Sequence, residues 1–135
     1  MTDELKLISA SSIKPREVEW LWYPFIPKGK VTIVQGDPGD GKSTFMLTLA
    51  AMMTAGHPFP FGKEDAEPAH VIYQTSEDDA DDTVVPRFLK AGGNPEMLTF
   101  IDESDKSITF ADERIAEAIK KTNAKMLILD PLSAY

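Results

Sequence analysis

The sequence lacks cysteine, long apolar runs and an excess of positive charge, and each absence removes a class of protein. With no cysteine among 135 residues, the chain can form neither a disulfide framework nor a zinc site built on thiolates. No apolar run approaches the roughly 20 residues needed to span a bilayer. The acidic start, residues 1–4, leads into no long apolar region and is therefore not a signal peptide. We expect a cytoplasmic protein without a membrane segment.

The formal net charge of −8 limits the partners of this chain. Because a chain this acidic has no field that attracts phosphate backbones, it is a poor general binder of DNA or RNA. Any such binding must use a localised patch or segments outside this sequence. Hydrophobic residues make up 42% and charged residues 27% of the chain, which are ordinary values for a globular domain.

Apolar, β-branched segments alternate with amphipathic ones along most of the chain. Strands are expected in four places, at residues 30–34, 69–75, 98–101 and 125–130. Helices are expected at residues 42–55, after the acidic stretch 77–82 as far as Gly92-Gly93, and at residues 109–121. Such alternation, with continuously apolar strands, predicts an α/β fold whose parallel sheet is covered on both faces. Residues 1–29 are expected to be an irregular N-terminal segment and residues 30–135 to belong to the α/β core.

One motif carries a specific chemistry. Residues 36–43 match the pattern G-x-x-x-x-G-K-[ST] at every fixed position. The segment reads Gly36, Asp37, Pro38, Gly39, Asp40, Gly41, Lys42 and Ser43, and Thr44 follows it. Its glycines let the backbone turn so that successive N–H groups point at a phosphate, and the helix that follows adds its positive amino end. The motif predicts a phosphate-binding P-loop between a strand and a helix.

Four side chains of this loop have expected roles. Lys42 would place its ammonium on the β- and γ-phosphates, and the hydroxyl of Ser43 would ligate Mg²⁺. Asp37 and Asp40 stand close to the expected polyphosphate, so we expect the backbone to bind it while these carboxylates face solvent. ATP and Mg²⁺ are the expected cofactors.

Two carboxylates outside the loop complete a possible site for hydrolysis. Asp130 ends an apolar strand, and ligands of open α/β sheets lie at such carboxyl ends, so Asp130 is expected to hold Mg²⁺ opposite Ser43. In many P-loop enzymes the glutamate that orients the attacking water directly follows this aspartate. Here Pro131 follows Asp130, so that carboxylate must come from elsewhere in the chain. Glu77, at the end of the strand predicted over 69–75, is the candidate; alternatively, Glu77 and the acids after it only favour a helix N-terminus.

Three segments together resemble the RecA-like ATPases of the plasmid RepA replicative-helicase group, which includes AAA family ATPases of phages and mobile elements. They are the P-loop, the turn Ser76-Glu77-Asp78-Asp79, and the stretch from Leu127 to Ala134 that contains Asp130-Pro131-Leu132-Ser133. The resemblance covers about residue 15 to the end. It implies a RecA-type core, a catalytic glutamate at Glu77 and a Walker B aspartate at Asp130.

The resemblance also implies partners. Members form rings, usually hexamers, bind ATP between subunits and act on single-stranded DNA through loops that follow the Walker B strand. Because the chain stops five residues after Asp130, we expect it to be the N-terminal part of a longer ATPase with an incomplete core. Turnover by this part alone should then be weak or absent, and DNA should be bound by other segments.

Two other functions remain open at this point. A small-molecule or nucleotide kinase would use the same P-loop, although no arginine-rich lid is visible. A nucleotide-dependent interaction module would bind ATP only to order an assembly.

Overall fold

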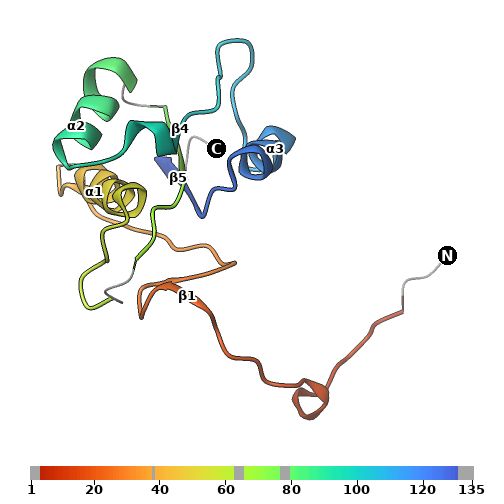
Figure 1. The fold of residues 1–135 in the computed structure, drawn as a ribbon. Helices are drawn as coiled ribbons and strands as arrows, with labels where there is room; N and C mark the ends of the chain where they lie inside the picture. The colour runs from red at the N-terminus through yellow and green to blue at the C-terminus, as the bar shows by residue number, and fades with distance from the viewer. Residues whose placement is uncertain (1–3, 38, 63–65, 77–79, 131–135) are drawn as a thin grey trace. The chain divides into compact units, whose positions relative to one another are not determined.

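The structure is a computed structural model that describes residues 4–37, 39–62, 66–76 and 80–130. The chain divides into two compact units, Met1–Ile33 and Val34–Tyr135, and each is described by itself (Figure 1).

The first unit contains a small hairpin within the segment that was expected to be irregular. Strand β1 (Trp20–Trp22) pairs antiparallel with β2 (Ile26–Pro27), after a single 3₁₀ turn at Ala10–Ser12. Two aromatic pairs stabilise the hairpin, Trp20 with Tyr23 at 5.2 Å between ring centroids and Trp22 with Phe25 at 4.8 Å. The four aromatic rings therefore pack in two pairs within the hairpin.

The strand predicted at residues 30–34 is not formed, and that prediction is wrong. Val31 and Ile33 are 69% and 61% exposed. A strand exists only where a neighbour accepts its backbone hydrogen bonds, and among the described residues none pairs with this segment. Apolar, β-branched composition showed a suitable segment but could not show whether a neighbouring strand is present.

The second unit is built on a parallel sheet of three strands in the order β4-β3-β5. They are β4 (Leu98–Thr99), β3 (Val71–Thr75) and β5 (Met126–Asp130). In the register between β3 and β5, Tyr73 is paired with Ile128 and Thr75 with Asp130. The predictions of strands at 69–75, 98–101 and 125–130, and of a parallel sheet, are confirmed. The first and third strands are slightly shorter than predicted, and β4 has only two of the four predicted residues.

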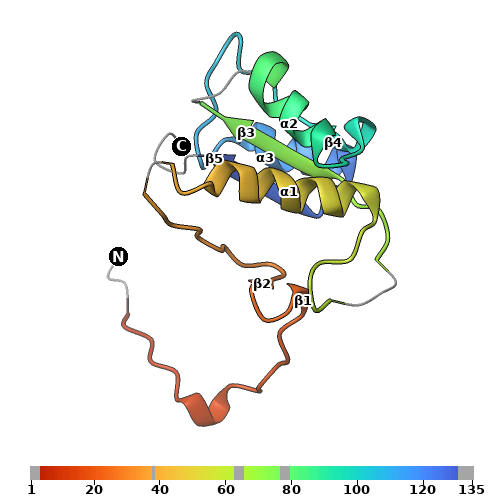
Figure 2. The same ribbon diagram turned by 90° about the vertical axis from the view of Figure 1, so that its left-hand side faces the viewer.

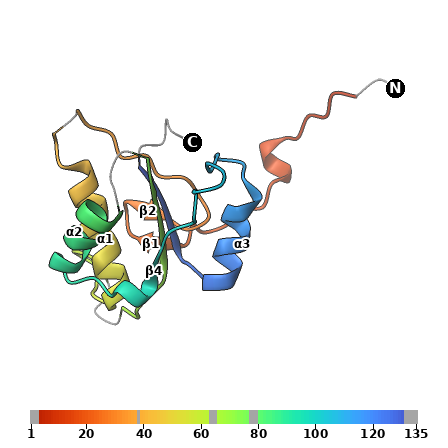
Figure 3. The ribbon, with the colours of Figure 1, turned by 90° about the horizontal axis from the view of Figure 1, so that it is seen from above.

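Helices cover both faces of this sheet. Helix α1 (Lys42–Ala55) and helix α2 (Val85–Lys90) lie on one face and α3 (Glu113–Thr122) on the other (Figure 3). A view from the side shows α1 lying in front of the strands and α3 behind them (Figure 2). A π-helical turn at Ala80–Val84 precedes α2, and a 3₁₀ turn at Pro95–Met97 precedes β4. The α/β class with a parallel sheet follows directly from this arrangement.

The ends of two helices show how local sequence sets their bounds. Helix α1 has the bounds predicted for it and ends at Gly56, whose φ of 71° lies in the left-handed region that favours glycine. Helix α3 begins four residues later than predicted. The carboxylate of Asp112 accepts a hydrogen bond from the N–H of Arg114 at 2.9 Å and caps the helix there.

The core lies between β3 and the helices α1 and α2. Four consecutive residues of β3 are buried, as expected for a strand covered on both faces. The core side chains are Leu47, Leu49, Ala50, Ala51, Met53, Val71, Ile72, Tyr73, Val84, Phe88, Leu98, Ile108 and Ile128. This packing fixes α1 against the sheet and so fixes the loop from which α1 begins.

Candidate nucleotide-binding site

The predicted P-loop runs into the amino end of α1. Its backbone has a φ of 88° at Gly39 and 84° at Gly41, a left-handed conformation that glycine adopts without steric cost. These two glycines are therefore required by the shape of the loop. Pro38 lies outside the described residues.

Two side chains of the loop turn back onto its own backbone. The ammonium of Lys42 donates a hydrogen bond to the carbonyl of Gly36, and the N–H of Asp37 donates to Oδ2 of Asp40 at 2.7 Å. A Cβ at Gly36 would lie 3.3 Å from both Asp40 Oδ2 and Lys42 Cδ. The Asp40 carboxylate therefore caps a backbone N–H of the loop, rather than only facing solvent as its position in the motif suggested.

Ser43 and Asp130, 87 residues apart in sequence, meet at the end of β5. The hydroxyl of Ser43, in the first turn of α1, donates to Oδ2 of Asp130 at 2.6 Å. Asp130 is the last residue of β5, and the backbone N–H of Ser76 reaches the Asp130 carbonyl at 3.4 Å. The P-loop helix and the carboxyl ends of β3 and β5 therefore meet at one edge of the sheet.

Tyr73 joins this pair, and the sequence reasoning missed it. Its hydroxyl donates to the same oxygen, Oδ2 of Asp130, at 3.0 Å. The available signal was positional, because Tyr73 is the one residue of its strand with an aromatic ring and a hydroxyl. Only the strand register, which a sequence does not display, shows that it faces Asp130.

Glu77, the candidate for orienting water, lies outside the described residues. Of the remaining loop positions, Thr44 is exposed and its carbonyl accepts a hydrogen bond from Thr48 Oγ1 at 2.8 Å inside the helix. Within the ranges that the structure describes, no group of three or more His, Cys, Asp or Glu side chains could hold a metal ion. A cation at Ser43 and Asp130 would therefore need further ligands from water or phosphate.

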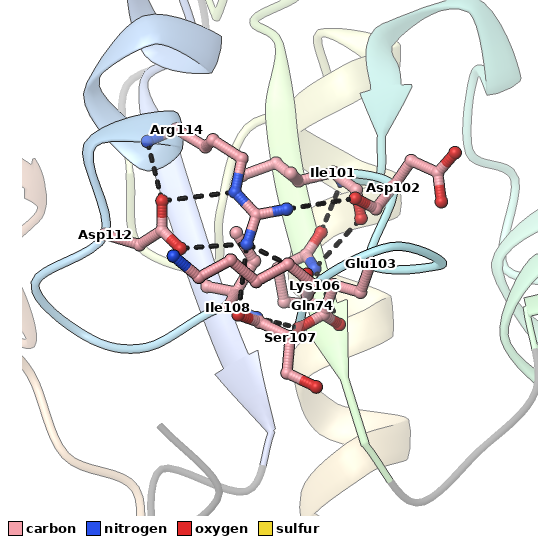
Figure 4. A network of polar contacts seen from close by, with 9 residues as sticks. All are labelled: Gln74, Ile101, Asp102, Glu103, Lys106, Ser107, Ile108, Asp112 and Arg114. Carbon is pink, nitrogen blue, oxygen red and sulfur yellow. Dashed lines mark hydrogen bonds and ion pairs between the residues drawn. The ribbon is translucent and has the colours of Figure 1, made fainter.

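A polar network fixes the loop that follows β4 (Figure 4). Gln74, buried in β3, accepts from the N–H of Ile101 at 2.5 Å and donates to the Ile101 carbonyl at 3.3 Å and to Glu103 at 3.2 Å. Glu103 in turn accepts from the N–H of Ile108 at 2.6 Å. The Gln74 amide thus pairs with the Ile101 backbone as a neighbouring peptide would, just beyond the end of β4.

Arg114 holds the rest of this loop. Its guanidinium donates to the carbonyls of Asp102, Lys106 and Ser107 at 3.3, 2.9 and 3.0 Å, and it forms an ion pair with Asp112 at 2.9 Å. Hydrogen bonds from the Arg114 side chain and backbone lower the pKa of Asp112 to about 2. The hydrogen bond from the N–H of Ser104 lowers the pKa of Asp102.

The α/β fold with its three-stranded parallel sheet is compatible with that of P-loop NTPases. A family model described as "AAA domain" matches residues 2–135. The chain belongs to this family, and the membership indicates a nucleotide-binding protein of the ATPase type. No curated protein and no solved structure matches the chain. In the part of the chain that the structure describes, no helix is long and apolar enough to cross a membrane.

Proposed function

We propose that this chain binds ATP on the loop 36–44 and hydrolyses it with the help of Mg²⁺. The observation that carries the proposal is the 2.6 Å hydrogen bond between Ser43 and Asp130. It brings the last residue of the P-loop motif to the carboxyl end of a parallel strand, which is where ligands of α/β sheets bind.

The loop and its helix supply the phosphate-binding groups. Backbone N–H groups around Gly39 and Gly41 and the amino end of the 14-residue helix α1 attract negative charge. Lys42 already lies over the loop, on the Gly36 carbonyl. Its flexible four-carbon stem allows the ammonium to exchange this carbonyl for a phosphate oxygen.

Ser43 and Asp130 fit a magnesium ion chemically. Both offer hard oxygen ligands, and Mg²⁺ is typically bound in proteins by one or two carboxylates together with waters and substrate phosphates. When bound, the ion would neutralise charge on the β- and γ-phosphates. In this arrangement the Ser43 hydroxyl donates a hydrogen bond to Asp130, so an oxygen lone pair of the hydroxyl is available for the metal.

Glu77 completes the proposed site as the residue that orients the attacking water. Support comes from its place in the sequence, because Ser76 is held to the Asp130 carbonyl at the same edge of the sheet. An arginine from a neighbouring subunit would supply the remaining positive charge.

The particular ATPase that we propose is a RecA- or RepA-like motor of DNA replication or repair. In this proposal the protein forms a ring, and single-stranded DNA is bound outside this acidic chain. The membership of the AAA domain family and the positions of Glu77 and Asp130 support it.

Titration with a fluorescent ATP analogue, with and without Mg²⁺, tests the binding site. Lys42→Ala should weaken binding by about ten- to a hundredfold, since it removes a charged hydrogen-bond donor. Asp130→Asn should abolish the tightening that Mg²⁺ brings. The exposed Lys120→Ala is the matched control and should bind like the unaltered chain. Equal binding by Lys42→Ala would overturn the proposed site.

Phosphate release separates the functions that share such a site. The assay uses the full-length protein, because turnover by this part alone should be weak and DNA should bind outside it. Release stimulated by single-stranded DNA, and lost in Glu77→Gln, supports the motor. Transfer of phosphate to a small molecule would instead identify a kinase. Nucleotide-dependent assembly that is unchanged in Glu77→Gln, with no release, would identify an interaction module.

A further inference from the structure

Tyr73 is a buried tyrosine whose hydroxyl ends on the proposed magnesium carboxylate. Its side chain is 1% exposed, and the hydroxyl donates to Asp130 Oδ2 at 3.0 Å. A tyrosine hydroxyl in the interior needs a hydrogen-bond partner, and many acceptors could satisfy it. The choice of this carboxylate links the centre of β3 to the site.

Parallel pairing brings the two residues together. Tyr73 is paired with Ile128, and Asp130 lies two residues further along β5. Because side chains alternate between the faces of a strand, Asp130 shares the face of Ile128 and therefore of Tyr73. A long aromatic side chain reaches such a diagonal neighbour.

Both hydrogen bonds that the described residues make to this carboxylate end on the same oxygen. Ser43 donates to Oδ2 from one element and Tyr73 from another. Two donors in fixed positions set the rotation of the carboxylate about its Cβ–Cγ bond, which is a broad, soft torsion when unrestrained. The direction of Oδ1 is then set as well.

The tyrosine is itself held firmly. Its ring packs edge-on against Phe100, with centroids 6.4 Å apart and planes at 71°. Only two torsions separate the hydroxyl from a backbone that is fixed in the central strand, so little freedom remains at the oxygen.

We propose that Tyr73 is a positioning residue for magnesium, acting through Asp130. It holds Oδ2 so that Oδ1 and the Ser43 hydroxyl oxygen keep a fixed relation to a cation between α1 and β5. This inference rests on the proposed function, which makes Ser43 and Asp130 the metal ligands. Tyr73 itself contacts neither the metal nor the nucleotide.

Tyr73→Phe tests the role because it keeps the ring and removes only the donor. The Mg²⁺ concentration that half-saturates the tightening of a fluorescent ATP analogue should rise by about two- to tenfold, the effect of one hydrogen bond. Binding of the analogue in EDTA should not change. In an Asp130→Asn background the Phe substitution should have no further effect, because both act on the same group. Tyr23→Phe, at an exposed tyrosine, is the matched control.

The outcomes separate this proposal from the one it rests on. An unchanged Mg²⁺ requirement in Tyr73→Phe, with Asp130→Asn impaired, overturns the positioning role and leaves the proposed function standing. An Asp130→Asn variant that responds to Mg²⁺ like the unaltered chain overturns both.

A measurement on the unaltered chain tests the role of Tyr73 even if the Tyr73→Phe variant folds poorly. The buried Tyr73 hydroxyl proton should give a slowly exchanging proton resonance. Addition of Mg²⁺ to the ADP-bound chain should shift this resonance. A resonance that stays unmoved by Mg²⁺ contradicts the role.

Discussion

Gly93 is a position where the addition of one methyl group should have a large and traceable effect. A Cβ built there would lie 2.3 Å from Cε2 and from Cζ of Phe88, and 2.6 Å from Cε1. Non-bonded carbons normally approach to about 3.5 Å, so the ring or the backbone has to move by about 1 Å. Phe88 is 0% exposed, so the ring cannot turn out into solvent without leaving the core.

The expected loss of stability follows from this overlap. Overpacking of a tight core costs about 1–3 kcal/mol, so Gly93→Ala should lower the free energy of unfolding by that amount. For a unit of this size the midpoint of thermal unfolding should fall by about 5–15 °C. Thermal melts followed by circular dichroism measure the fall.

The neighbouring glycine supplies the matched control. A Cβ at Gly92 would have no atom within 4 Å, but its φ is +92°, so Gly92→Ala costs only backbone strain, about 1–2 kcal/mol. Phe88→Leu removes the ring atoms that Gly93→Ala would strike. The double variant with Gly93→Ala should therefore be at least about 1 kcal/mol more stable than the sum of its single changes, whereas the pair with Gly92→Ala should be additive within about 0.5 kcal/mol. A loss from Gly93→Ala that persists undiminished beside Phe88→Leu would refute the contact as its cause.

Two further predictions concern charges. Asp40→Asn keeps the acceptor for the Asp37 N–H but removes a negative charge beside the proposed polyphosphate site. ATP should therefore bind roughly three- to tenfold more tightly, and less so at high salt; equal affinities at low salt would contradict this. The pKa of Asp112 is about 2 in the folded chain, against an ordinary 3.8. Its stabilising effect is therefore present above about pH 4 and is lost as the pH falls towards 2. Urea unfolding between pH 5 and pH 2.5 should show a smaller loss in Asp112→Asn than in the unaltered chain, and equal losses would exclude this pair as a source of acid sensitivity.

Much of the second unit could be predicted from sequence because its signals are local. A glycine-rich turn, an apolar helix and a terminal glycine sufficed for α1, whose predicted bounds of 42–55 agree with the structure. Strand β5 was recognisable from its apolar run, and its final carboxylate from the general rule about strand ends.

The failures occurred where the outcome depends on residues distant in sequence. Residues 30–34 have the composition of a strand, but pairing requires a neighbour that composition cannot reveal. Tyr73 was not singled out, because only the register of β3 and β5 shows that it lies beside Asp130. The position of Asp40 also escaped prediction, because its bond to the Asp37 N–H depends on the turn of the whole loop. The roles of Glu77, Lys42, Ser43 and Asp130 in catalysis and metal binding remain predictions.

The way in which Arg114 holds the loop after β4 has a practical consequence. Arg114 binds this loop at the main-chain carbonyls of residues 102, 106 and 107, so the loop keeps its path whichever side chains stand at those last two positions. Lys106 and Ser107 can therefore be exchanged for cysteine in a chain that has no other thiol. A single dye attached at either position would then label the loop that follows β4 at one defined place, on a backbone that Arg114 holds.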